Sequence, residues 1–238
     1  MMPLETLQLL GFGPGGWGLP LLTAAGVTVV TAILGFGLGS LLGVAGASLK
    51  LSRHIFCRLI GQTYTTVVRG VPEILIIYLF YFGGSLWLTS IMNIGGFDGF
   101  YSLPGLATGV IAIGVVSGAY QTEAFRSAYL RLDRGQIEAG RSCGMRRRLL
   151  LRRIIVPQTL HFALPALGNI WQSALKETSL LSVIGLTELL RQTGIAAGST
   201  HQPLLFFSVA AAAFFLVGRI TGRLIRRVED HMNKPWRR

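Results

Sequence analysis

Long runs without a single Asp, Glu, Lys or Arg residue constrain this chain more than any other feature. Five such runs occur, at residues 6–49, 74–97, 99–122, 154–175 and 192–218. A helix that crosses a bilayer needs about 20 predominantly apolar residues, and each run is long enough. Charged residues make up only 13% of the chain, whereas soluble domains carry about 25%. The sequence therefore predicts an all-α, polytopic membrane protein and disfavours a soluble enzyme.

The first run is long enough for two helices, but the segment Gly13-Pro14-Gly15-Gly16 interrupts it. The part before this interruption is too short to cross a membrane. One helix is therefore expected in the first run and five in the whole chain. We expect the transmembrane helices at residues 19–49, 62–82, 103–125, 157–176 and 204–224.

The basic residues predict how these helices are oriented. Nineteen of the 22 Lys and Arg residues fall in three segments, at residues 50–58, 123–153 and 219–238. Lys and Arg concentrate in the cytoplasmic segments of membrane proteins, so all three are expected in the cytoplasm. This distribution requires an odd number of spans, with the N-terminus outside and the C-terminus in the cytoplasm. A nucleic-acid binder would gather its positive charge on one folded face instead.

The expected domain organisation follows from this topology. Residues 1–18 contain no Lys or Arg and are expected to be a periplasmic segment. Residues 19–224 form the transmembrane domain, and residues 225–238 form a basic cytoplasmic tail.

The sequence offers no local support for catalysis or for a metal site. The stretch from Gly11 to Gly16 matches G-x-G-x-x-G only literally, because that fingerprint belongs to a βαβ unit, whereas here ten residues precede the stretch and a membrane span follows it. The chain contains no G-x-x-x-x-G-K-[ST], H-E-x-x-H or C-x-x-C motif, and its four histidines are scattered. We expect no catalytic residue, no metal ion and no cofactor bound by this chain.

Small residues recur every four positions in the first expected helix, at Gly35, Gly39, Gly43 and Ala47. Such spacing lets two helix backbones approach closely, which favours association in lipid. We favour packing within the chain over a contact between subunits.

The most distinctive segment lies in the long basic loop. Residues 138–142 suit a short helix that Gly144 would terminate, and Pro157 suits the first turn of the next span. The pattern predicts a short amphiphilic helix outside the lipid, at about residues 135–146, joined rigidly to a membrane helix. An ordinary basic loop is the alternative that the residues alone leave open.

This loop follows the pattern E-A-(A/G)-x3-G-x9-I-x-(L/V)-P, which resembles the coupling motif of ABC importer permeases. Further segments resemble signatures of the polar amino-acid subfamily, at residues 64–73, 118–123, 163–165 and 176–180. The resemblance covers residues 22–224 and is nearest to the histidine/arginine/lysine/ornithine and octopine/nopaline permeases. Two departures are small: Gly140 replaces the usual second Ala, and Val156 replaces Leu.

The resemblance implies a type-I ABC importer permease fold in the bacterial inner membrane. It also implies a heterodimer with a homologous permease, two copies of an ATPase subunit that binds ATP, and a periplasmic solute-binding protein. The chain itself would be no enzyme and would help to move a polar, basic amino acid or an opine. The residues that would couple it to the ATPase are Glu138, Ala139, Gly140, Arg141, Gly144 and Pro157.

Charged residues near the expected spans are candidates for contact with the substrate, because a charge at lipid depth is costly and commonly functional. The carboxylate of Glu177 suits a guanidinium or an ammonium group, and the hydroxyls of Thr178 and Ser179 suit a substrate carboxylate. Lys176 and Glu73 complete this set. The alternatives are that Lys176 extends to the membrane surface and that Glu73 pairs with Arg69 on one helix face.

Two other functions fit a polytopic membrane protein. Ion-coupled secondary transporters commonly contain internal repeats, and five spans cannot be halved. A membrane scaffold that transports nothing would not need the coupling motif.

Overall fold

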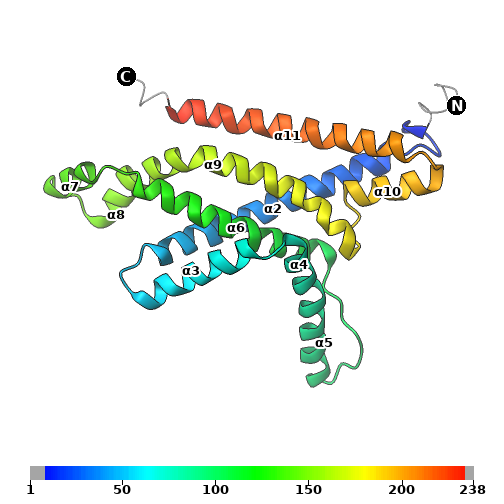
Figure 1. Ribbon diagram of the computed structural model, residues 1–238, viewed down its shortest axis with the longest axis horizontal. Coiled ribbons are helices and arrows are strands. Elements are labelled where there is room, and N and C mark those ends of the chain that lie inside the picture. The colour runs from blue at the N-terminus through cyan, green and yellow to red at the C-terminus, as the bar shows by residue number, and fades with distance from the viewer. Residues whose placement is uncertain (1–8, 234–238) are drawn as a thin grey trace. The chain divides into compact units, whose positions relative to one another are not determined.

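The computed structural model describes residues 9–233, and every regular element within them is a helix, which confirms the all-α class. The elements are drawn in Figure 1. In chain order they are α2 (Gly18–Lys50), α3 (Ile55–Gly70), α4 (Glu73–Tyr78), η1 (Leu79–Gly83), α5 (Gly84–Ile94), α6 (Gly105–Leu130), α7 (Arg134–Ser142), α8 (Arg147–Leu150), η2 (Leu151–Ile155), α9 (Val156–Glu177), η3 (Thr178–Ile184), α10 (Leu189–Thr200) and α11 (Pro203–Asn233).

The chain divides into two compact units. Unit 1 contains the residues through Gly35 together with Pro72–Ile113 and Ala174–Arg219, and unit 2 contains Phe36–Val71, Gly114–Ser173 and the segment from Ile220 onward. The long helices α2, α6, α9 and α11 contribute residues to both units.

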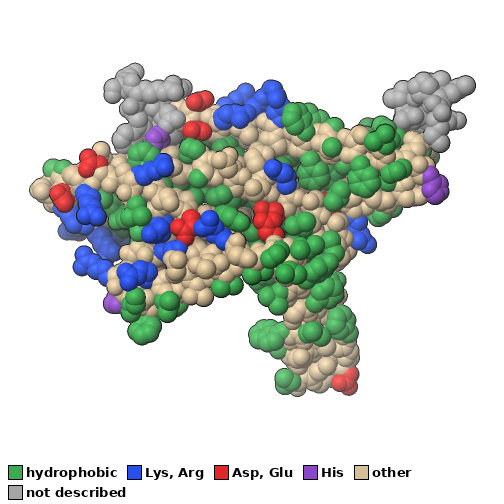
Figure 2. Space-filling view, in the orientation of Figure 1, with side chains coloured by type: hydrophobic (Ala, Val, Ile, Leu, Met, Phe, Trp, Pro, Cys, Tyr) green, Lys and Arg blue, Asp and Glu red, His purple; other side chains and the backbone are tan. Residues whose placement is uncertain are grey.

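Unit 1 has a core at the start of α2, where Leu21 packs with Leu189, Ala196 and Phe206 of α10 and α11. The fully buried Glu188 caps α10 by accepting hydrogen bonds from the backbone N–H groups of the next helical turn. Helix α4 packs against η3 and continues through the π-helical turn η1 into α5. Large hydrophobic side chains, among them Leu86, Trp87 and Ile91, are exposed along α5, and Figure 2 shows hydrophobic groups on this part of unit 1, as expected for a helix in lipid.

Unit 2 packs α3 and the second half of α6 against the second half of α2. At Gly43, a Cβ atom would lie 2.7 Å from the Cβ atom of Gln121 on α6, so only glycine permits this approach. Gln121 is fully buried, accepts a hydrogen bond of 2.8 Å from Ser40 and donates one of 3.2 Å to the Phe36 carbonyl. These contacts confirm that the small residues of the first span serve packing within the chain.

Four helices among the described residues are long and apolar enough to cross a membrane. They are Gly18–Lys50, Glu73–Ile94, Gly105–Leu130 and Pro203–His231. The first, third and last overlap three of the expected spans. Helix α9 corresponds to the fourth expected span but falls outside this set, so the count of five spans stays a prediction.

The expected second span, residues 62–82, is wrong in its boundaries. Helix α3 ends at Gly70, Val71 is extended with φ −103° and ψ 137°, and a new helix begins at Glu73. Pro72 has no N–H to donate and disfavours a helical conformation at the residue before it. The apolar span therefore runs from Glu73 to Ile94.

The fourth helix also begins earlier than expected. Helical backbone runs from Arg147 through α8, the π-helical turn η2 and α9, so Pro157 lies well inside a continuous helix. The wider turn of η2 directly precedes this proline, in keeping with the π-turns that accommodate local disruptions in helices. Helix α11 likewise continues past residue 224 to Asn233, and residues 1–8 and 234–238 of the expected terminal segments lie outside the described residues.

Candidate functional site

Helix α7 (Arg134–Ser142), which overlaps the expected segment of about residues 135–146, is a short helix with well-defined ends. The side chain of Asp133 caps its start by accepting a 2.8 Å hydrogen bond from the Gly135 N–H. At its other end, the N–H of Gly144 donates to the Arg141 carbonyl and the N–H of Met145 donates to the Gly140 carbonyl. Gly144 has a φ of +75°. This pair of bonds around a left-handed glycine is the Schellman motif, and it confirms that Gly144 terminates the helix.

Packing against the following helix holds α7 in place. Gly140 is buried, and a Cβ atom there would lie 2.7 Å from Leu150 and 3.0 Å from Ile154. Gln158 of α9 also donates a 2.6 Å hydrogen bond to Gln136 of α7. The continuous helix from α8 to α9 is therefore attached directly to α7, which is the arrangement that a lever between the membrane and a partner requires.

The opposite face of α7 is free to contact another protein. Glu138, Ala139 and Arg141 are exposed, and Gly144 and Pro157 are exposed nearby. Figure 2 shows Lys and Arg side chains gathered over α7 and α8 in unit 2. Of the six residues predicted to couple the chain to an ATPase, five are therefore accessible, and Gly140 contributes close packing instead.

The residues predicted to contact the substrate lie in unit 1. Glu73 begins α4 and Glu177 ends α9, and their side chains lie within hydrogen-bonding reach of each other. Both are half-buried, whereas the neighbouring Lys176 is exposed. The structure thus brings together two carboxyl groups that are far apart in the sequence, and two adjacent carboxyl groups attract a cation.

The two hydroxyl residues that follow have partners of their own. Thr178 is fully buried and donates a 2.7 Å hydrogen bond to the Leu175 carbonyl. Ser179 is half-buried and donates a 2.7 Å hydrogen bond to the Lys176 carbonyl. Each hydroxyl would have to exchange this bond in order to donate to a substrate, so their role in binding stays a prediction.

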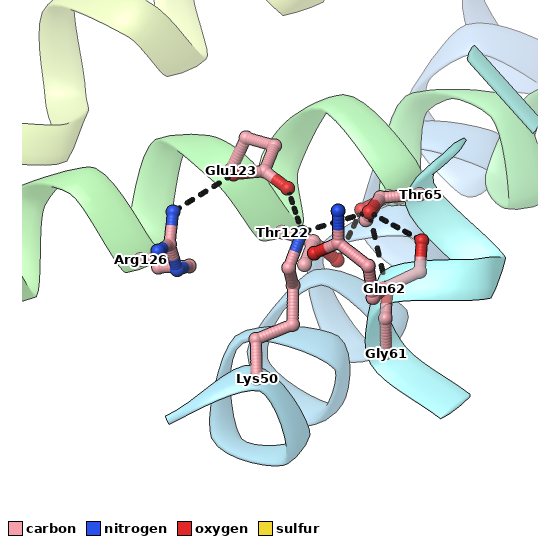
Figure 3. A network of polar contacts seen from close by, with 8 residues as sticks. Lys50, Gly61, Gln62, Thr65, Thr122, Glu123 and Arg126 are labelled. Carbon is pink, nitrogen blue, oxygen red and sulfur yellow. Dashed lines mark hydrogen bonds and ion pairs between the residues drawn. The ribbon is translucent and has the colours of Figure 1, made fainter. Parts of the chain in front are cut away.

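Sequence reasoning missed an ion pair within unit 2. The ammonium group of Lys50 contacts the Glu123 carboxylate and donates a 2.8 Å hydrogen bond to Thr65, as Figure 3 shows. The other carboxylate oxygen of Glu123 lies 3.5 Å from Arg126. The Lys50 side chain is only 5% exposed. This network joins α2, α3 and α6, and its signal in the sequence is that opposite charges end the first and third charge-free runs.

Arg69 and Glu73 do not share one helix face as expected, because α3 ends at Gly70 and α4 begins at Glu73. The guanidinium group of Arg69 lies over the ring of Tyr120 in unit 2, 5.2 Å from the ring centre. This is the geometry of a cation–π contact. Within residues 9–233, no group of three or more His, Cys, Asp or Glu side chains is arranged to hold a metal ion.

Comparisons with known proteins agree with this architecture. Residues 35–234 match the model of the family described as binding-protein-dependent transport system inner membrane component. The chain is 47% identical over 232 residues to an octopine transport system permease protein, OccQ of Rhizobium meliloti, covering 98% of each chain. It is 46% identical to the nopaline transport system permease protein NocQ of Agrobacterium fabrum, covering 97% of this chain and 98% of the other.

A more distant relative and two solved structures extend the comparison. The histidine/lysine/arginine/ornithine transport system permease protein HisQ of Escherichia coli is 35% identical, with 85% of this chain and 88% of that protein covered. A crystal structure of an amino acid ABC transporter with histidines is 29% identical, covers 90% of this chain and 95% of the other, and gives a TM-score of 0.75. The inward-facing methionine transporter MetNI shares the fold at 16% identity, with 99% of each chain covered and a TM-score of 0.58.

Proposed function

Because the chain belongs to the family of binding-protein-dependent transport system inner membrane components, we propose that it is one permease subunit of an ATP-driven importer in the bacterial inner membrane. Its substrate is a polar solute with a cationic group, either a basic amino acid or an opine. The chain catalyses no reaction, and ATP binds to a separate ATPase subunit. Relatives named for octopine, nopaline and basic amino acids support this substrate class.

The single observation that carries the substrate class is the carboxyl pair of Glu73 and Glu177. Two half-buried carboxylates repel each other, and a guanidinium or ammonium group between them relieves this repulsion while donating charge-assisted hydrogen bonds to both. The exposed ammonium group of Lys176 next to this pair suits the carboxylate of an amino acid or opine. Both charged ends of such a solute therefore find a partner within unit 1.

The proposed assembly contains a homologous second permease subunit, two ATPase subunits and a periplasmic solute-binding protein. The exposed face of α7 docks onto the ATPase, and the helix from Arg147 to Glu177 connects this docking helix with the carboxyl pair along one continuous stretch of chain. ATP drives transport only if the ATPase binds the outward- and inward-facing states with different affinities. A separate binding protein contributes the larger part of the specificity.

The carboxyl pair is tested by uptake measurements on the complete transporter in proteoliposomes. Glu177→Gln removes one charge-assisted hydrogen bond, which is worth about 1.5–3 kcal/mol, so uptake of arginine or octopine should fall about tenfold or more. Glu177→Asp keeps the charge but shortens the reach, and should give an intermediate rate. Asp98→Asn, which removes an exposed carboxylate elsewhere in unit 1, is the matched control and should transport normally.

The double variant Lys176→Met with Glu177→Gln distinguishes substrate contact from a structural ion pair. If Glu177 only neutralises Lys176, the double variant should regain normal uptake of a cationic amino acid. Normal uptake in that variant would place the substrate contacts elsewhere, and continued loss supports the proposed site.

A further inference from the structure

A cleft of about 1160 Å³ lies in unit 2, between the end of α2, the end of α6 and the segment from α7 to α9. Ligand pockets in proteins commonly measure roughly 300–1,000 Å³, so this cleft has room for a large ligand. It differs from the carboxyl pair of unit 1 both in its elements and in its chemistry, and of the residues assigned to substrate contact or to coupling only Arg141 lines it.

The rim of the cleft is strongly basic. Arg53 and His54 line it from the α2–α3 connection, and Arg141 and Arg147 line it from α7 and α8, whereas no Asp or Glu residue lines it. All four side chains belong to exposed residues. Among the described residues, none of the three arginines forms an ion pair. The rim therefore offers free guanidinium groups to an anion.

The interior of the cleft is apolar and continues into the membrane-spanning segments. Its apolar lining includes Val44, Phe125, Leu150, Ile155, Val156 and Leu160. Val44 lies in α2, which is long and apolar enough to cross a membrane, and Leu160 lies in the fourth charge-free run, so this part of the lining suits lipid. Val44 and Val156 are each 54% exposed. The cleft thus passes from apolar surface within the bilayer to basic groups where the charged segments begin.

The basic rim and the apolar interior together indicate what kind of molecule the cleft binds. An acyl chain fits the apolar part, and a phosphate group fits the arginines at the rim; basic pockets between transmembrane helices bind phospholipid head groups in this manner. A soluble anion would not need the apolar part, and a protein surface would not need to reach lipid depth. We propose that this cleft binds an anionic phospholipid, with its phosphate between Arg53 and Arg147 and an acyl chain against Val156 and Leu160.

Native mass spectrometry of the complete purified transporter tests the proposal, with dioleoyl phosphatidylglycerol and dioleoyl phosphatidylcholine added at equal concentrations. The unchanged transporter should retain phosphatidylglycerol in preference. The double variant Arg53→Gln with Arg147→Gln should bind it on the order of tenfold more weakly, because each arginine near the membrane surface contributes to binding an anionic lipid. The matched control, Arg58→Gln with Arg148→Gln, removes the same charge from exposed neighbours that do not line the cleft and should bind normally.

Three further experiments distinguish a bound lipid from a free anion and from a protein contact. Val156→Trp fills the apolar part and should reduce retention of phosphatidylglycerol while the charge of the rim is unchanged. Inorganic phosphate in excess should not displace the lipid, and displacement would overturn the proposal in favour of a free anion. The Val156→Cys variant tests for a protein in the cleft. If its cysteine cross-links to another subunit in a lipid-free complex, a protein contact fills the cleft and the proposal is overturned. Equal retention of the two lipids, or equal loss in the two double variants, would also overturn it.

Discussion

At the scale of single residues, the pair of Lys50 and Glu123 links two helices of unit 2. The two residues are separated by 73 positions and belong to different helices. Sequence reasoning could place each at the end of a charge-free run, but it could not pair them, because pairing depends on how closely α2 and α6 approach. Gly39 and Gly43 make this approach possible, and the structure shows that α6 fills the space beside them.

The ion pair leads to a prediction about stability. Lys50→Met should lower the unfolding temperature of the purified transporter, because removing one partner of a buried pair costs about 3–5 kcal/mol. The cost should lie at the low end, since Glu123 is 23% exposed and keeps Arg126 as a neighbour.

Scanning calorimetry or a dye-based thermal shift measures this change. The double variant Lys50→Met with Glu123→Gln should recover most of the loss, because no unpaired charge remains in the core. An unfolding temperature that falls further in the double variant would contradict this role of the pair.

At the scale of elements, the sequence predicted some helices well and others poorly for identifiable reasons. Helix α7 was predictable because its ends depend on local chemistry, namely the left-handed glycine at Gly144. The long helices α2 and α6 were predictable from their lack of charge. The break at Val71–Pro72 was missed, although the proline and the charged residues on either side of it, Arg69 and Glu73, were signals in the sequence.

Helix α7 carries a prediction about coupling. Glu138→Lys changes an exposed side chain and should leave membrane insertion intact while abolishing recruitment of the ATPase and uptake. Gly144→Asp should weaken both, because a left-handed conformation costs an L-residue about 1–2 kcal/mol and the Schellman motif depends on it. Co-purification of the ATPase subunit measures recruitment directly.

The control for this experiment is Asp230→Lys, which makes the same change of charge at an exposed position of α11. It should recruit the ATPase normally. Full recruitment and coupled hydrolysis in both α7 variants would mean that α7 is not the docking helix.

At the scale of the whole molecule, the distribution of basic residues predicts one topology. A reporter that is active only in the periplasm should work when fused after Phe12 or near Asp98. The same reporter should be silent when fused after Arg147 or at the C-terminal end of the chain, because those segments carry most of the Lys and Arg residues. A periplasmic signal from a fusion at residues 146–148 would contradict both the orientation and the odd number of spans.

The central claim is that this chain helps a separate ATPase to import a cationic solute, and reconstitution tests it most directly. The chain is assembled in proteoliposomes with the second permease subunit, the ATPase subunit and the binding protein. We predict that the binding protein loaded with substrate stimulates ATP hydrolysis, and that uptake requires ATP but no ion gradient. Uptake that proceeds without the ATPase subunit and stops when a proton or sodium gradient is dissipated would contradict the account and indicate an ion-coupled transporter.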